Sequence, residues 1–212
     1  MKLAIPKGRL QEPALALLRA AGFPLASAGA RAYRLEAPDG VEARLFKPRS
    51  IPELIDIGAI DVGLTGLDVV RDAEVTHAVC HLDLGLNRVR IVVATPVAKT
   101  GILQSPPPRP LVVATEYPNL AERWMMARGL AHVVLRSHGS TEAYLPDVAD
   151  VIIDCVETGA TLAANGLCGV EELFESTTWV VAHRDVLARP TPTVARFLER
   201  VRAHLAAPGS SC

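Results

Sequence analysis

The sequence predicts an α/β protein with two lobes, each built on a small mixed or largely parallel sheet, and a central cleft between them. Apolar, β-branched segments alternate with helical segments along the chain, which is typical of sheets covered by helices. Half of the 212 residues are hydrophobic but only 4% are aromatic. The core must therefore consist mainly of Leu, Val, Ile and Ala, which suits such sheets.

The lobe boundaries follow from the predicted order of strands. We place the crossings between the lobes near residues 88–92 and 177–181. Residues 1–90 plus 178–212 then form lobe I, and residues 91–177 form lobe II. Ligands of open α/β sheets bind at the carboxyl ends of the strands, so we expect the cleft to collect these ends.

Lobe I is expected to begin with a strand, a basic loop and a helix. Lys7-Gly8-Arg9 forms the loop, and leucines at helical spacing follow until Gly22 ends the helix. Pro38-Asp39-Gly40 predicts a hairpin turn, and Ser50 is expected to cap a helix with Pro52 in its first turn. We expect strands at 2–6, 32–37, 41–46 and 60–64, helices at 10–21, 51–58, 67–71 and 193–205, and extended chain at 75–84 and 178–182.

Lobe II is expected to alternate strands and helices. The run Pro106-Pro107-Pro108 predicts a loop, because proline interrupts helices. Ser137 to Glu142 is expected to open a helix, and residues 208–212, at the end of the chain, are expected to fray. We expect strands at 90–95, 111–115, 132–136 and 151–153, a helix at 117–128, and extended chain at 170–176.

The segment from Val151 to Leu167 combines a buried strand, an acidic turn, a small-residue loop and a short helix. Asp154 falls at the end of the strand, and Thr158-Gly159-Ala160-Thr161 leads into the helix. Free N–H groups at a helix start, a glycine without Cβ and two hydroxyls suit a phosphate. Asp154 and Glu157 would then face sugar hydroxyls or a Mg²⁺ ion. The alternative is an ordinary strand–loop–helix connection with a threonine cap.

Four further segments offer similar chemistry. Lys7-Gly8-Arg9 supplies two cations where the first strand ends, and Arg49, whose guanidinium suits phosphate oxygens, precedes a helix. Thr65-Gly66 and Gly139-Ser140-Thr141 each lie between a strand and a helix. Each segment alone also fits a solvated turn or a helix cap. Their clustering in one chain favours a pair of phosphate-rich ligands.

Composition excludes several classes of function. The net charge is −1 with mixed signs along the chain, which indicates neither a nucleic-acid surface nor a membrane-binding arm. No apolar run approaches the ~20 residues of a spanning helix, and the N-terminus does not resemble a signal peptide. The cysteines lack paired or zinc-like spacing and predict reduced thiols in a cytoplasmic protein; they are Cys80, Cys155, Cys168 and Cys212.

Six segments carry the pattern of a known family, in the family's order and over nearly the whole chain. They are Ala4–Leu10, Pro48–Pro52, Asp61–Asp68, Tyr117–Ala121, Gly139–Glu142 and Asp154–Leu167. In these segments the sequence resembles the short form of ATP phosphoribosyltransferase, the first enzyme of histidine biosynthesis. Ser50, His138 and Asp72 depart from the family's commonest residues, which are Asp, Asn and Glu.

The resemblance implies a fold similar to type II periplasmic binding proteins. It implies transfer of the 5-phosphoribosyl group from phosphoribosyl pyrophosphate to N1 of ATP, with release of pyrophosphate and with Mg²⁺ as cofactor, carried by the substrate. The resemblance is to the short form, so we expect no regulatory domain of the kind that the long form carries. The short form implies a separate regulatory subunit that resembles histidyl-tRNA synthetase, and a homodimer within a hetero-oligomer.

The resemblance also assigns site residues. The 5-phosphate would be held by Glu157, Thr158, Gly159, Ala160, Thr161 and Leu162, and the ribose hydroxyls by Asp154. ATP or pyrophosphate would be bound with the help of Lys7, Gly8, Arg9, Arg49, Thr65 and Gly66. Gly139 and Ser140 add backbone donors to substrate. Of these residues, we assign Asp154, Lys7 and Arg9 as catalytic.

Other functions also fit parts of the pattern. A type I phosphoribosyltransferase acting on a free base also has acids before Thr-Gly-x-Thr, but usually two adjacent ones, whereas Asp154 and Glu157 are three positions apart. A non-catalytic phosphate-ligand binding protein of the same fold is a second alternative, which the missing signal peptide disfavours. A catalytically silent subunit is a third.

Overall fold

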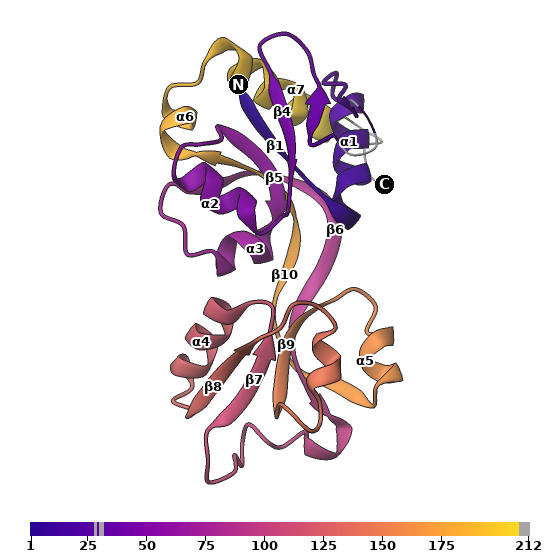
Figure 1. The fold of residues 1–212 in the computed structure, drawn as a ribbon, viewed down its shortest axis with the longest axis vertical. Coiled ribbons are helices and arrows are strands. Elements are labelled where there is room, and N and C mark those ends of the chain that lie inside the picture. The colour runs from indigo at the N-terminus through magenta and orange to yellow at the C-terminus, as the bar shows by residue number, and fades with distance from the viewer. Residues whose placement is uncertain (28, 30–31, 208–212) are drawn as a thin grey trace. The chain divides into compact units, whose positions relative to one another are not determined.

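The computed structural model describes residues 1–27, 29 and 32–207. The chain divides into two compact units, which are residues 1–87 with 177–212 and residues 88–176. Strands β6 (Ala78–Pro96) and β10 (Leu167–His183) each continue from one unit into the other. The predicted α/β class with mixed sheets is confirmed (Figure 1).

The first unit is built on parallel strands with antiparallel neighbours. Its strands besides β10 are β1 (Lys2–Pro6), β2 (Ala26–Ser27), β3 (Arg34–Glu36), β4 (Glu42–Phe46) and β5 (Val62–Gly66). They lie in the order β2–β3–β4–β1–β5–β10. Strand β1 is parallel to both β4 and β5, so the carboxyl ends of these three strands meet at one edge.

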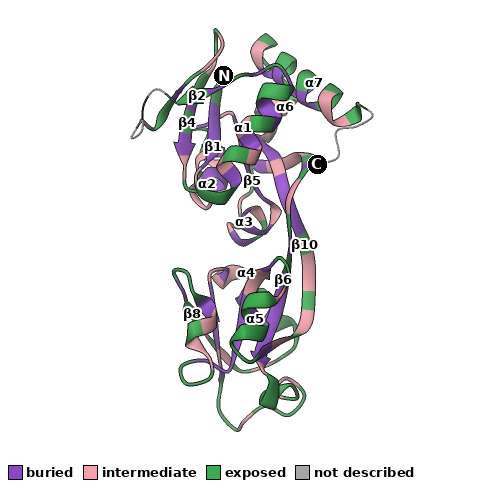
Figure 2. Ribbon diagram, turned by 90° about the vertical axis from the view of Figure 1, so that its right-hand side faces the viewer, coloured by how far each residue is buried: buried purple, intermediate pink, exposed green. Residues whose placement is uncertain are grey.

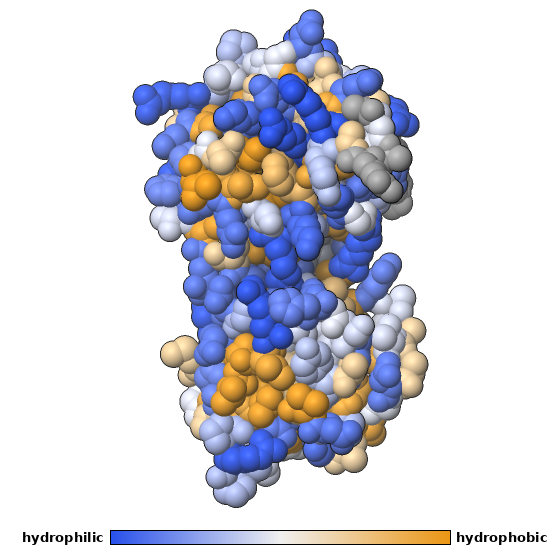
Figure 3. All heavy atoms as spheres, viewed as in Figure 1, coloured by the Kyte–Doolittle hydropathy of each residue, from blue (hydrophilic) through white to orange (hydrophobic). Residues whose placement is uncertain are grey.

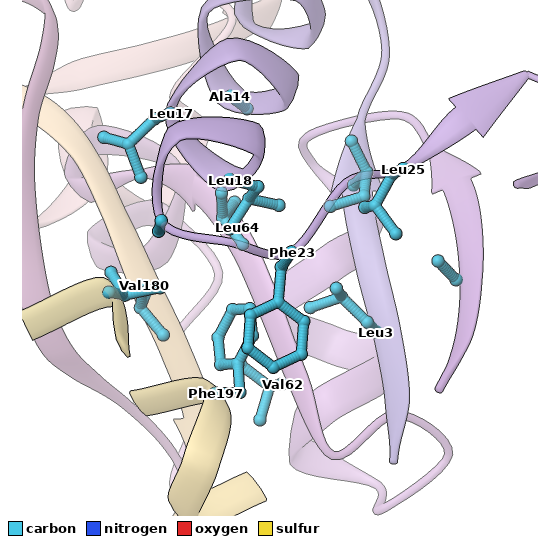
Figure 4. Packing of buried hydrophobic residues seen from close by; sticks show 14 of the residues in the cluster. Leu3, Ala14, Leu17, Leu18, Phe23, Leu25, Val62, Leu64, Val180 and Phe197 are labelled. Carbon is cyan, nitrogen blue, oxygen red and sulfur yellow. The ribbon is translucent and has the colours of Figure 1, made fainter. Parts of the chain in front are cut away.

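Helices cover both faces of this sheet. They are α1 (Gln11–Ala20), α2 (Ser50–Asp56), α3 (Leu67–Asp72), α6 (Arg184–Ala188) and α7 (Pro192–Ala206). Because side chains alternate along a strand, Leu3 and Ile5 pack with α1 and α7, whereas Ala4 packs with α2. Phe23 and Phe197 belong to the same core cluster as Leu3 and Ile5. Their rings meet edge to face, with centroids 5.2 Å apart (Figure 4).

The second unit has a sheet in the order β10–β6–β9–β7–β8, with β7 (Leu111–Thr115), β8 (His132–Arg136) and β9 (Val151–Val156). Strand β7 is parallel to β8 and β9, and β9 is antiparallel to β6. Helix α4 (Pro118–Ala127) packs on one face, over Val113 and Ile153. The short helix α5 (Ala160–Ala164) packs Leu162 on the other, beside Ile152. Figure 2 shows inner strands such as β1 and β5 as largely buried, whereas the edge strand β8 is exposed or half-buried.

The edge strand β8 leaves apolar surface uncovered. Val133 and Leu135 point to the same face of this strand and are both exposed, and Figure 3 shows apolar surface over β7 and β8. Such a patch is of the kind that assembly buries. Within the described residues, no helix is long and apolar enough to cross a bilayer.

Several predicted elements were wrong in detail. Ser50 does not cap α2 but is its first residue, and the turn before it is closed by main-chain bonds, including Ser50 N–H to the Lys47 carbonyl at 3.0 Å. The segment from Ser137 to Glu142 does not open an α-helix but leads into the 3₁₀ turn η3 (Thr141–Tyr144). The loop at Gly8 is part of another such turn, η1 (Gly8–Leu10), and η2 (Val97–Lys99) is a third.

Other differences concern strand and helix lengths. The segments expected at 75–84 and 90–95 belong to one long strand, β6. Those expected at 170–176 and 178–182 belong to another, β10. Thr65-Gly66 ends strand β5 and does not form a separate turn. Strand β2 and helix α6 were not expected. The prediction of fraying at residues 208–212 lies outside the described residues, as does Cys212.

Candidate functional site

Asp154 lies near the carboxyl end of β9, in the middle of the second unit's sheet. Its half-buried carboxylate accepts the Cys155 N–H at 2.7 Å. Burial is the largest cause that raises the pKa of Asp154 to about 6, and the negative charges of Glu142 and Glu116 act in the same direction, while hydrogen bonds from the Cys155 N–H and Thr141 act against it. Carboxyl groups whose pKa is raised by burial and by neighbouring charges are concentrated at functional sites.

Buried hydroxyls fix the chain around Asp154. The Thr115 hydroxyl donates to the Ile153 carbonyl at 2.6 Å and accepts the Tyr117 N–H at 2.8 Å. The hydroxyls of Ser137 and Thr141, both buried, lie 2.9 Å apart. The Thr115 hydroxyl thus joins β7 to β9, and the Ser137 N–H, which donates to the Thr115 carbonyl at 2.8 Å, joins the end of β8 to β7, so the carboxylate lies among connected strands.

The loop after β9 exposes small groups to solvent. Gly159 has a φ of +84°, a conformation that favours glycine. The Thr158 hydroxyl accepts the Ala160 N–H at 3.3 Å, and Thr161 is exposed. Leu162 is buried in the core and anchors the loop. Because α5 has only five residues, backbone N–H groups and hydroxyls, and not a helix dipole, would bind an anion here.

Gly139 and Ser140 lie beside the same acids. Both residues have positive φ, +107° for Gly139 and +48° for Ser140. A Cβ on Gly139 would lie 4.0 Å from Glu116 Oε1. The structure therefore brings Gly139, Glu116 and Asp154 to the carboxyl ends of β8, β7 and β9. Glu116 was missed at the sequence level, although its position directly after a predicted strand was an available signal.

In the first unit, the predicted residues gather at the ends of β1, β4 and β5. Lys7 follows β1, and its N–H donates to the Phe46 carbonyl at the end of β4 at 2.8 Å. Gly8 and Arg9 are exposed in η1. Thr65 is fully buried, and its hydroxyl donates to the Pro48 carbonyl at 3.1 Å. Thr65 therefore has a structural bond that holds the loop before α2.

Arg49 and Gly66 contact acids on α3. Arg49 Nη1 lies 3.5 Å from Asp72 Oδ2, and the Asp72 side chain is only 7% exposed. A Cβ on Gly66 would lie 2.2 Å from Asp68 Oδ1, so this position has no room for a side chain unless Asp68 moves. Asp72 orients a predicted binding arginine, and sequence reasoning had noted this residue only as a departure from the family pattern.

Metal ligands and cysteine thiols are the remaining candidate groups. Among the residues described, no group of three or more His, Cys, Asp or Glu side chains is placed to hold a metal ion. Cys80, Cys155 and Cys168 are free thiols, and burial raises the pKa of Cys80 to about 11. The Cys80 thiol is therefore protonated at neutral pH.

Comparison with known proteins adds to this geometry. The family model described as ATP phosphoribosyltransferase matches residues 47–203. The ATP phosphoribosyltransferase of Deinococcus radiodurans is 35% identical over 214 residues, which cover 94% of this chain and 90% of the relative. The Thermotoga maritima ATP phosphoribosyl transferase (HisG:HisZ) complex contains a chain with 28% identity and a TM-score of 0.84, covering 97% of this chain and 98% of that one.

A more distant likeness concerns the fold alone. The periplasmic VFT2 domain of Bordetella pertussis BvgS aligns with a TM-score of 0.51 at 13% identity, over 96% of this chain and 86% of that one. The expected likeness to periplasmic binding folds is confirmed at this level.

Proposed function

Because this chain belongs to the ATP phosphoribosyltransferase family, we propose that the carboxyl ends of its two sets of parallel strands hold the two substrates of that reaction. The chain is an enzyme of the first step of histidine biosynthesis. It transfers the 5-phosphoribosyl group of phosphoribosyl pyrophosphate to N1 of ATP and releases pyrophosphate. The observation that carries the proposal is the exposed Gly159 loop directly after the strand that bears Asp154.

The second unit would hold phosphoribosyl pyrophosphate. The loop from Glu157 to Leu162 presents backbone N–H groups and the hydroxyls of Thr158 and Thr161, which suit the 5-phosphate. Asp154, at the end of the preceding strand, would accept the ribose hydroxyls. Burying the 5-phosphate at a fixed distance from Asp154 would use remote binding energy to orient the sugar ring.

The first unit would bind ATP or the leaving pyrophosphate. Lys7 and Arg9 follow β1, and Arg49 follows β4, so three cations lie at neighbouring strand ends. Asp72 beside Arg49 reduces the freedom of its guanidinium. Cations held in this way stabilise negative charge as it develops on the phosphates.

The proposed chemical step is a displacement at the anomeric carbon. The N1 lone pair of adenine forms the new C–N bond, and the bond from the anomeric carbon to the pyrophosphate oxygen breaks with its electron pair leaving on pyrophosphate. The carboxylate of Asp154 would stabilise the positive charge on the ring, while Lys7 and Arg9 would stabilise the leaving group. N1 already has a lone pair, so no general base is required.

We propose Mg²⁺ as cofactor, brought in by the phosphates of the substrate. The carboxylate oxygens of Asp154, Glu116 and Glu142 are the ligand type that Mg²⁺ prefers, but they do not form a metal site of the protein alone. Asp154 is the residue that would face the ion. When bound, Mg²⁺ supplies charge that offsets the leaving pyrophosphate.

The enzyme works with partners. Since the Thermotoga maritima relative is a HisG:HisZ complex, this chain assembles with a separate regulatory subunit of that kind. We propose that the subunit resembles histidyl-tRNA synthetase and that this chain forms a homodimer within the hetero-oligomer. The uncovered apolar face of β8 supports assembly. We also propose that the enzyme works in the cytoplasm.

Pyrophosphate release tests the function. The chain is mixed with ATP, phosphoribosyl pyrophosphate and Mg²⁺, with and without the partner subunit, and pyrophosphate is measured. We expect release that requires both substrates. Release with a free purine or pyrimidine base in place of ATP would indicate a type I phosphoribosyltransferase, and ligand binding without release under any condition would indicate a binding protein or a silent subunit.

A further inference from the structure

A pair of buried hydroxyls in the second unit has no part in the chemistry proposed above. The oxygens of Ser137 and Thr141 lie 2.9 Å apart, and the two residues are 3% and 1% exposed. Ser137 directly follows β8, and Thr141 begins η3, which contacts both β7 and β9. Burying a hydroxyl costs free energy unless it is hydrogen-bonded, so the pair is held by specific partners.

The direction of these hydrogen bonds follows from the acid at their end. The Thr141 hydroxyl is hydrogen-bonded to the side chain of Asp154. An ionised carboxylate only accepts hydrogen bonds, and a hydroxyl has a single hydrogen to donate. Thr141 therefore donates to Asp154 and accepts from Ser137, which the distance between the two hydroxyls alone leaves open. The hydroxyls form a chain that ends on the carboxylate, and the Ser137 hydroxyl strengthens the bond that Thr141 donates.

This chain adds a second restraint on the orientation of the Asp154 carboxylate. Rotation of an aspartate about χ2 is only weakly restricted by its own geometry. The Cys155 N–H, which donates at 2.7 Å, comes from the adjacent residue. The negative charges of Glu142 and Glu116 act against the ionised group. A donor on a separate element, η3, therefore restricts a carboxylate that one neighbouring N–H would hold loosely.

We propose that Thr141 is a positioning residue for the reaction: its hydroxyl, supported by Ser137, holds the Asp154 carboxylate in the orientation that accepts the ribose hydroxyls. The inference rests on the proposed function, because Asp154 is the proposed contact of the ribose. Thr141 is buried and has no surface to offer the substrate. Its effect is therefore confined to the sugar part of phosphoribosyl pyrophosphate and passes through Asp154.

Calorimetry on the full chain with ribose 5-phosphate and, separately, with inorganic phosphate tests this confinement. Thr141→Val removes the hydroxyl and is expected to weaken binding of ribose 5-phosphate about 2- to 10-fold, the range for one hydrogen bond. Inorganic phosphate has no sugar hydroxyls and should bind as it does to the wild type. Thr141→Ser restores the hydroxyl and should restore the affinity. In steady-state kinetics, Thr141→Val should raise the KM for phosphoribosyl pyrophosphate and leave the KM for ATP unchanged.

A second buried threonine of the same unit provides the matched control. Thr95 is fully buried, and its hydroxyl donates to the Asp150 carbonyl at 3.1 Å, at the opposite end of β9 from Asp154. Thr95→Val should lower the free energy of unfolding and leave both affinities unchanged. If Thr95→Val weakened binding of ribose 5-phosphate as much as Thr141→Val, the loss would be one of general packing and the inference would be overturned.

A double-mutant cycle tests whether Thr141 acts through Asp154. In the Asp154→Ala background, Thr141→Val should cause no further loss of affinity for ribose 5-phosphate. Losses that add in the double variant, or wild-type affinity in Thr141→Val alone, would overturn the positioning role. A wild-type chain that passes these binding tests but releases no pyrophosphate from ATP and phosphoribosyl pyrophosphate would instead contradict the proposed function and leave the positioning role standing.

Discussion

Replacing Asp154 by Asn should stabilise the fold near neutral pH while lowering turnover. Burial and two nearby carboxylates raise the pKa of Asp154 from 3.8 to about 6, so the protonated form favours the folded state. That contribution is complete below pH 3.8 and is lost as the pH rises through about 6. Asn cannot ionise, so the Asp154→Asn variant does not lose this stability as the pH rises. At about 1.4 kcal/mol per tenfold change in acidity, the gain is about 3 kcal/mol at most, and less because the carboxylate is partly exposed.

The assay is urea denaturation of both proteins at several pH values. Asn keeps an oxygen that can accept the Cys155 N–H, so the change isolates the charge. Below pH about 4 the two proteins should have similar free energies of unfolding, and above pH about 7 the variant should be the more stable. The exposed Asp147 provides a matched control, since Asp147→Asn should show no such trend. A wild type at least as stable as Asp154→Asn above neutral pH would refute the reasoning.

Three further changes probe other parts of the account. Thr161→Val should weaken phosphoribosyl pyrophosphate binding by about 1.5–3 kcal/mol, the contribution of a hydrogen bond to a charged group, and unchanged affinity by calorimetry would remove this residue from the site. Asp72→Asn removes the charge that faces Arg49, so steady-state kinetics should give a higher KM for ATP; an unchanged KM would separate this pair from ATP binding. Phe197→Ala deletes a fully buried ring packed on Phe23 and should lower the free energy of unfolding by about 3–5 kcal/mol, with a loss under 1 kcal/mol counting against the packing described.

The elements that the sequence predicted best are those that local chemistry determines. Strand β1 and strand β7 have the predicted bounds, because each is a short apolar segment bounded by turn residues. Helix α7 begins at Pro192, one residue before the predicted start, where Thr191 caps it by accepting the Val194 N–H. Gly159 has the positive φ that makes glycine suitable for a tight loop.

The elements that were missed depend on partners distant in sequence. Strand β9 continues through Val156 because Arg90 of β6 pairs with it, and no pattern within the segment indicates that pairing. The helix expected after Ser137 is only the 3₁₀ turn η3, which begins at Thr141, after Gly139 and Ser140 have both adopted positive φ. Helix propensity alone does not predict these positive-φ backbone conformations.

The same limit applies to the site. Asp154 and the loop after it are contiguous in sequence, so a motif could reveal them. The contact of Asp72 with Arg49 and the hydrogen bond of Thr141 with Asp154 join segments that only the folded sheet brings together. The assignments of individual residues to substrates remain predictions.

A crystal structure of the chain with phosphoribosyl pyrophosphate and Mg²⁺ tests the central claim most directly. The account predicts the 5-phosphate within hydrogen-bond distance of the backbone N–H groups and hydroxyls of residues 157–162, with the ribose hydroxyls on Asp154. A 5-phosphate bound by Lys7 and Arg49 in the first unit, with residues 157–162 unoccupied, would contradict it.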